Sequence, residues 1–168
     1  DVEQTDYLKL KSYKINGLEE FNSMGKEILN REENRETKDN FNKEIFIKDS
    51  ETKFLLPFYK TQYLYNAKKI SGNSLNPNKD WSSVEKEYMN SSDQIMYIDD
   101  FLSQEAIKEI REFSLSSKVW VHQMPNKYLG AFSDSGFISP LHLQIGEELQ
   151  KKLPKLFGKY NIGKFWGF

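Results

Sequence analysis

The chain has 168 residues, of which 29% are charged and 14% aromatic; its net charge is -1, and it contains no cysteine. This length allows one domain with a sizeable core, and the balanced charge argues against nucleic acid or an anionic membrane as a partner. The lack of cysteine excludes disulfides, a thiol nucleophile and thiolate metal ligands. No apolar run approaches the roughly 18 residues of a transmembrane helix. We therefore expect a cytoplasmic protein with no nucleic-acid and no membrane partner.

The first 70 residues have the pattern of a helical segment. We predict a helix with one apolar stripe after an N-cap at Asn16, followed by a solvated charge run at 31–40. Residues 40–49 fit a short helix or a strand, and we favour the helix. Pro57 lies inside an aromatic cluster and predicts an irregular packed segment. The stripe of the first helix comprises Leu18, Phe21, Gly25, Ile28 and Leu29.

A loop at 71–80, rich in Asn, Gly, Pro and Ser, follows this helical segment. Such a composition is typical of a connection between two folded regions. We therefore divide the chain into a helical N-terminal segment, 1–70, and a second region, 71–168.

The second region alternates helices with strands. Asp80 and Ser103 are predicted N-caps of two helices. Between these helices, residues 94–100 are rich in β-forming side chains and predict a short strand. Two further strand-like runs, 118–124 and 127–132, are close enough in sequence to form a hairpin.

The last elements complete an α+β fold class. Ser139 and Pro140 predict a helix start, because proline at the first helical position lacks only a donor that would have no partner there. Pro154 ends that helix, and residues 164–168 begin another strand.

The histidines are the first candidates for metal chemistry. A two-histidine, one-carboxylate iron site usually begins with His-x-Asp or His-x-Glu on a strand. Met124 stands two residues after His122, and Gln144 stands two residues after His142. Neither histidine can begin the motif, and we interpret both as surface or hydrogen-bonded residues, with His142 facing solvent or a polar rim. The sequence thus offers no metal ligand.

Other polar residues give no stronger signal of catalysis. Asp99 and Asp100 would point to opposite faces of a strand, so we interpret them as part of a strand-to-helix turn. Ser133, Ser135 and Ser139 lack a histidine and an aspartate in a recognisable nucleophile context. From the residues alone, this is a soluble α+β domain without an assembled active site.

The order and spacing of several runs in the second region resemble a known family. They are "LNPNKDWSSVEKEYMNSSDQIMYIDDFLSQEAIKEIREF", "SSKVWV", "YLGAF", "GFISPLHLQIGEELQKKLP" and "WGF". Together, over positions 54–168, they resemble the N-terminal region of a bacterial family of 2-oxoglutarate/Fe(II)-dependent oxygenases, whose members often follow tetratricopeptide-type helical repeats. The resemblance implies a hydroxylase acting on an unknown protein or small-molecule substrate.

The resemblance also implies a fold and its cofactors. The chain would hold the first strands and supporting helices of a double-stranded β-helix (jelly-roll) domain, truncated before its metal site. The His-x-Asp motif, the distal histidine and a basic residue for 2-oxoglutarate would follow Phe168. We therefore expect no catalytic residue in this chain, no binding of Fe(II) or 2-oxoglutarate by the fragment, and the rest of the domain as its partner.

Trp166 and Phe168 are the two candidate site residues. Strand alternation puts them on one face, where they either wall the cosubstrate pocket or pack against the helix at 140–153. The sequence leaves these alternatives open. It also leaves two non-catalytic functions: a helical interaction module centred on residues 1–70, and a degenerate oxygenase that retains only the scaffold.

Overall fold

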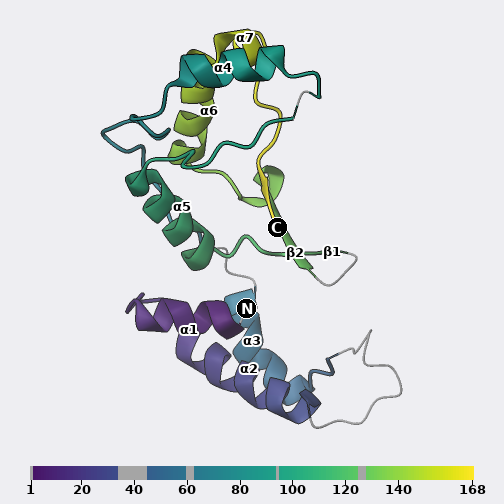
Figure 1. Cartoon of the computed structure of the whole chain (residues 1–168). Coiled ribbons are helices and arrows are strands. Elements are labelled where there is room, and N and C mark those ends of the chain that lie inside the picture. Colours follow the sequence, from purple (N-terminus) through teal and green to yellow (C-terminus); the bar gives the residue numbers. More distant parts are fainter. Residues whose placement is uncertain (1, 34–44, 60–62, 94, 125–127) are drawn as a thin grey trace. The chain divides into compact units, whose positions relative to one another are not determined.

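A computed structural model describes residues 2–33, 45–59, 63–93, 95–124 and 128–168. These residues form seven α-helices, a short 3-10 helix and three strands (Figure 1). The α+β class is therefore confirmed as a mainly helical fold with one small antiparallel sheet. The chain divides into two compact units, Asp1–Tyr63 and Leu64–Phe168.

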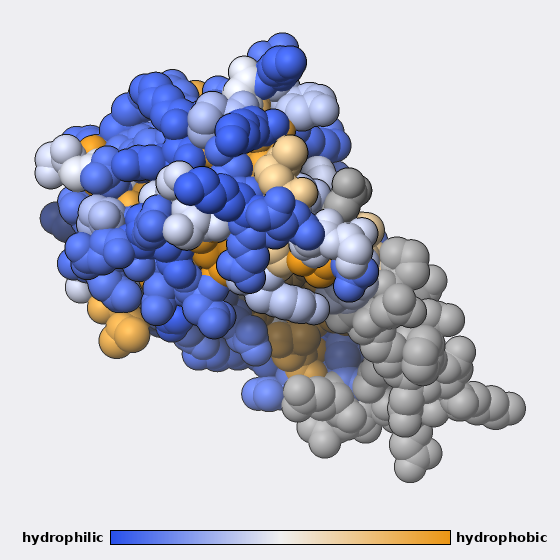
Figure 2. Space-filling view, turned by 45° about the horizontal axis from the view of Figure 1, so that its top comes forward, coloured by the Kyte–Doolittle hydropathy of each residue, from blue (hydrophilic) through white to orange (hydrophobic). Residues whose placement is uncertain are grey.

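Polar side chains predominate on one viewed face of the described residues. Figure 2 shows one face, on which small hydrophobic areas are separated by hydrophilic residues. Among the described residues, no helix combines the length and the apolar character needed to cross a membrane.

The first unit is built from three helices, α1 (Val2–Leu10), α2 (Leu18–Glu33) and α3 (Asp49–Tyr59). Gly17 precedes α2 with φ +78°, a left-handed conformation that favours glycine, so α2 does not take its cap from Asn16 as predicted. The predicted apolar stripe is buried except for Leu29, which is 37% exposed. The core of the unit consists of Leu8, Leu18, Phe21 and Phe58.

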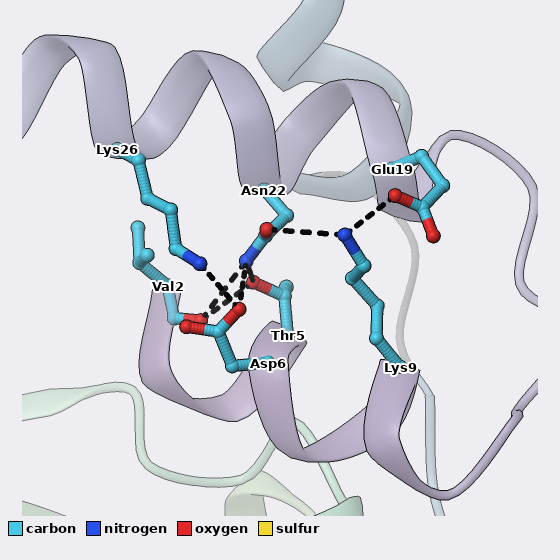
Figure 3. Close-up of polar contacts among 7 residues, drawn as sticks. All are labelled: Val2, Thr5, Asp6, Lys9, Glu19, Asn22 and Lys26. Carbon is cyan, nitrogen blue, oxygen red and sulfur yellow. Dashed lines mark hydrogen bonds and ion pairs between the residues drawn. The ribbon is translucent and has the colours of Figure 1, made fainter.

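Helices α1 and α2 are also joined by buried polar contacts (Figure 3). Asn22, which is 2% exposed, donates from Nδ2 to Thr5 Oγ1 at 2.7 Å and to Asp6 Oδ1 at 3.0 Å. Two lysines flank this contact: Lys26 pairs with Asp6 at 2.6 Å, and Lys9 lies 3.5 Å from Asn22 Oδ1. Because a buried amide without partners is costly, these contacts specify how α1 and α2 pair.

Helix α3 corrects two predictions. Residues 45–48 are not helical, and residues 40–44 of the predicted helix lie outside the described residues. Pro57 lies inside α3 rather than in an irregular segment. The helix ends only two residues later, so few of its hydrogen bonds are affected by proline, and Phe58 packs on Phe21 with ring centroids 4.4 Å apart.

The second unit contains four helices, and three of them begin with the predicted cap. Helix α4 (Trp81–Asn90) begins after Asp80, α5 (Gln104–Ser116) after Ser103 and α6 (Pro140–Lys152) after Ser139. Each cap side chain accepts a backbone N–H of the first turn, which confirms the three predicted helix starts. Helix α6 ends before Pro154, as predicted, and Pro154 then begins the short α7 (Pro154–Phe157).

Helix α6 also holds the segment that opens the second unit. Glu148 accepts the backbone N–H groups of Ser74 and Leu75 at 2.9 and 3.0 Å. Gln144 accepts the N–H of Ile70 at 2.9 Å and donates to Gly72 O at 3.0 Å. The units accordingly divide after Tyr63, whereas the sequence suggested a division after residue 70.

The sheet has the order β1-β2-β3, with both pairs antiparallel. Strands β1 (His122–Met124) and β2 (Tyr128–Phe132) confirm the predicted hairpin, and β3 (Trp166–Gly167) lies within the predicted last strand. The strand predicted at 94–100 is wrong for the described residues 95–100. Residues 95–100 pair with none of the described strands. The segment ends in a turn at Asp100, where φ is +49°.

Candidate functional site: the open face of the sheet

The strand register divides the sheet into two faces. Phe132 pairs with Trp166 and Ala131 with Gly167, while His122 pairs with Gly130. Since paired residues share a face and neighbours along a strand alternate, one face consists of even-numbered positions. We call this the aromatic face; its side chains are His122, Met124, Tyr128, Phe132, Trp166 and Phe168.

Where β2 pairs with β3, the opposite face is covered by the core of the second unit. Ala131 is fully buried there, and Phe165 packs against the same cluster, which includes Phe113 of α5 and Leu141 of α6. A Cβ added at Gly167 would lie 3.0 Å from Trp120 and 3.1 Å from Phe137. The absence of a side chain at Gly167 therefore lets β3 approach this core closely.

The aromatic face is a connected cluster of rings that remains open to solvent. Phe168 contacts Tyr128 edge-on at 5.4 Å between centroids and Phe132 at 6.2 Å, and His122 contacts Phe132 at 4.9 Å. Trp166 is nevertheless 58% exposed and Phe168 64% exposed. An exposed aromatic cluster of this kind is typical of a binding surface or of a face covered by another part of a structure.

Polar groups lie at the Phe132 side of the aromatic face. Lys164 lies 5.1 Å from the Phe132 ring centroid and forms an ion pair with Asp134 at 2.8 Å. Lys164 lowers the pKa of Asp134 through this contact, so the carboxylate stays ionised near neutral pH. His122 Nε2 lies 2.8 Å from Ser135 Oγ. The face thus combines apolar rings with a few hydrogen-bonding groups, as small-molecule sites commonly do.

The structure places Trp166 and Phe168 on the same face of the sheet and excludes one of the two contacts predicted for them. Their exposure and the contacts of Phe168 place them away from α6, so they do not pack against the helix at 140–153. The odd-numbered neighbours make the core contacts instead: Phe165 contacts His142 of α6 at 5.4 Å. The sequence missed the rest of the aromatic face, although the alternation of Tyr128 and Phe132 with smaller residues was a signal for it.

His142 corrects the prediction of a surface histidine. It is 5% exposed, and its ring lies 5.1 Å from that of Phe113 and 5.0 Å from that of Phe137. Burial lowers its pKa to about 4, which keeps the imidazole neutral, and Nδ1 lies 2.7 Å from Ser139 Oγ. The prediction that His142 is hydrogen-bonded is thus confirmed, whereas the prediction that it faces solvent or a polar rim is wrong. The role of His142 is structural.

The residues of the aromatic face do not fit an iron site. No group of three or more histidine or carboxylate side chains within reach of one metal ion occurs in the described part of the chain. The two histidines are engaged in separate places, His122 with Ser135 and His142 with Ser139. We therefore assign no metal ligand and no catalytic step to this chain.

Comparison with known proteins adds no family assignment. The chain matches no model of a protein family, no curated protein and no solved structure. Its candidate site is therefore defined by geometry: an exposed aromatic face on a sheet whose other face is anchored to α5 and α6.

Proposed function

We propose that this chain is the N-terminal part of an Fe(II)/2-oxoglutarate-dependent oxygenase domain that hydroxylates a protein or a small molecule in the cytoplasm. Two independent features support this proposal. One is the sequence resemblance over positions 54–168. The other is the placement of an aromatic face on the side of the sheet that the helices leave free.

The second feature carries most weight because it matches what a jelly-roll domain requires. In such a domain, helices support one face of a sheet, and the ligand pocket lies between the other face and a second sheet. Here α5 and α6 cover one face, and the aromatic face remains open. Trp166 and Phe168 would then wall the pocket and exclude water from the cosubstrate, which apolar side chains do well.

In this proposal, the residues that bind the metal lie outside this chain. Two histidines and one aspartate would hold Fe(II), leaving open positions for 2-oxoglutarate and for O₂, the oxidant of the hydroxylation. Within this chain, the contributions are structural: α5 and α6 fix the sheet, and the aromatic face lines the cavity. The fragment by itself is expected to be inactive.

The first test is to sequence the encoding DNA beyond the codon for Phe168. A reading frame that continues through His-x-Asp to a distal histidine supports the proposal, and the protein it encodes should convert 2-oxoglutarate and O₂ to succinate and CO₂ in the presence of Fe(II). A stop codon at that point, or a continuation without these ligands, would overturn it. Substituting the first histidine with alanine in the longer protein should abolish succinate formation.

A second candidate function is that of a non-catalytic interaction module. The first unit has its own core, and three consecutive apolar residues ahead of α3 are exposed, with Phe46 at 60%. Exposed apolar runs of this kind are common in contacts with partner proteins. This function, or that of a degenerate oxygenase scaffold, becomes the better explanation if the frame lacks the metal ligands.

A further inference from the structure

A second apolar hollow lies in the second unit, between α4, the segment 95–98 and α7. We call it the α4–α7 groove. Its volume is about 650 Å³, within the range of small-molecule sites. Figure 2 tilts the end of the molecule that carries α4 and α7 toward the viewer, and hydrophobic areas appear there among hydrophilic ones. The lining residues are Tyr88, Ile95, Met96, Ile98, Leu153, Lys155, Leu156, Phe157 and Tyr160.

The α4–α7 groove is lined mainly by apolar side chains and by one cationic residue. Lys155 is its single charged lining residue, and two tyrosines are its other lining residues with side-chain hydrogen-bonding groups. No ion pair of the Lys155 ammonium group occurs among the contacts of the described residues. The nearby Glu85 is only 7% exposed, and its carboxylate accepts the backbone N–H of Lys155 at 2.7 Å.

Basic residues predominate in the C-terminal stretch that lines the α4–α7 groove, whereas an acidic residue lines the hollow next to it. The stretch 149–168 contains lysines but no acidic residue, although the whole chain has a net charge of -1. An adjoining hollow shares Tyr88, Ile95 and Met96 with the groove and is lined by Glu87. The α4–α7 groove is thus lined by the cationic Lys155 and the adjoining hollow by the anionic Glu87.

We propose that the α4–α7 groove binds a small apolar carboxylate, with its chain along Ile95, Ile98 and Leu156 and its carboxylate at Lys155. The apolar lining favours a hydrocarbon body, and the cationic Lys155 favours a single anionic head. The volume fits a drug-sized ligand better than a partner protein, which would need about 800 Å² of surface on this side. This site is separate from the aromatic face and does not depend on the proposed function.

The test uses the full 168-residue chain and straight-chain carboxylates from hexanoate to decanoate. Calorimetric titration should show affinity rising about two- to fourfold with each added methylene, as burial of a CH₂ group predicts for a partly open groove. Decanol, which has the same chain without the charge, should bind more weakly than decanoate. Amide shifts in NMR spectra should centre on Tyr88, Ile98 and Leu156.

Two variants separate the head-group contact from the apolar contact. Lys155→Gln should weaken decanoate binding about two- to fivefold, the range of an exposed ion pair, and leave decanol binding unchanged. Lys108→Gln, which removes an exposed lysine of α5 outside the groove, is the matched control and should change neither. Phe157→Ala should weaken both ligands, because it shortens the apolar wall.

Four results would overturn the proposal, and the first three concern the affinities. They are affinity that does not change with chain length, decanol binding as tightly as decanoate, and equal effects of Lys155→Gln and Lys108→Gln. Binding of decanoate with amide shifts on the aromatic face instead of the α4–α7 groove would also overturn it. Because none of these experiments uses iron or 2-oxoglutarate, their failure leaves the proposed function unaffected.

Discussion

The two units of the chain differ in how far their stability rests on local sequence. In the second unit, Asp80, Ser103 and Ser139 cap helices through contacts with residues three positions ahead. In the first unit, Asn22 satisfies its amide by contacting residues on another helix, 16 and 17 positions away in the sequence. The first kind of contact can be predicted from spacing, whereas the second depends on how the helices pack.

The largest expected effect tests a long-range polar contact in the second unit, of the same kind as the Asn22 contacts in the first unit. Glu148→Ala removes the acceptor for the N–H groups of Ser74 and Leu75 and should lower the free energy of unfolding by about 2 kcal/mol. Chemical denaturation measures this change. Hydrogen exchange should accelerate in residues 70–75 and not in the first unit.

The neighbouring Glu147→Ala is the matched control for this change. Glu147 makes an exposed ion pair with Lys69 at 3.2 Å, so its loss should cost less than about 0.5 kcal/mol. Burial acts to raise the pKa of Glu148, but hydrogen bonds from Leu75 and Ser74 outweigh it and hold that pKa below its usual value. The contribution of Glu148 should therefore be present at neutral pH and be lost as the pH falls through its depressed pKa. Equal effects of the two substitutions would contradict the role of Glu148.

The pH dependence of the free energy of unfolding tests the burial of His142 in the core of the second unit. The pKa of His142 falls from 6.5 to about 4 on burial, so between these values the unfolded chain binds more protons than the folded chain. Stability should therefore decrease as the pH falls from about 6.5 to 4, by about 2 kcal/mol after allowance for solvent screening. Denaturation curves across this range measure it.

The His142→Phe variant identifies the source of that pH dependence. Phenylalanine does not titrate, so the variant should lose the decrease between pH 6.5 and 4 even if its overall stability changes. His122→Gln is the control and should keep the decrease. A variant at His142 with the pH profile of the original chain would show that another group is responsible.

The first unit should be sensitive to a single amide. Asn22→Ala removes the amide donor that contacts Thr5 Oγ1 and Asp6 Oδ1 and should lower the free energy of unfolding by about 1.5 kcal/mol. Hydrogen exchange should accelerate in α1 and α2 while the second unit is unchanged. Ser23→Ala, at the exposed neighbouring position, should be neutral or slightly stabilising. An equal loss of hydrogen-exchange protection in both units would contradict the conclusion that the Asn22 contacts stabilise the first unit independently of the second.

The sequence predicted best where a structure depends on neighbouring residues. The helix caps Asp80, Ser103 and Ser139, the hairpin and the shared face of Trp166 and Phe168 follow from spacing and strand alternation and are confirmed. The helix containing Pro57 and the burial of His142 could not be predicted, because each depends on aromatic partners from distant parts of the sequence. For the candidate site, alternation predicted that Trp166 and Phe168 share a face of the last strand. It did not predict that this strand pairs with β2, which supplies other residues of the aromatic face.

The smallest effect concerns the anchoring of the aromatic face. Gly167→Ala places a methyl group 3.0 Å from Trp120 and 3.1 Å from Phe137, so these rings must shift slightly, at a cost of about 1 kcal/mol. Gly163→Ala is the matched control, because nothing lies within 4 Å of its added Cβ, and it should be neutral or slightly stabilising. Denaturation gives the cost, and hydrogen exchange at β2 and β3 shows where it falls. If the two variants behave alike, close packing at Gly167 does not hold β3 in place, and the exposure of Trp166 and Phe168 would then need another cause.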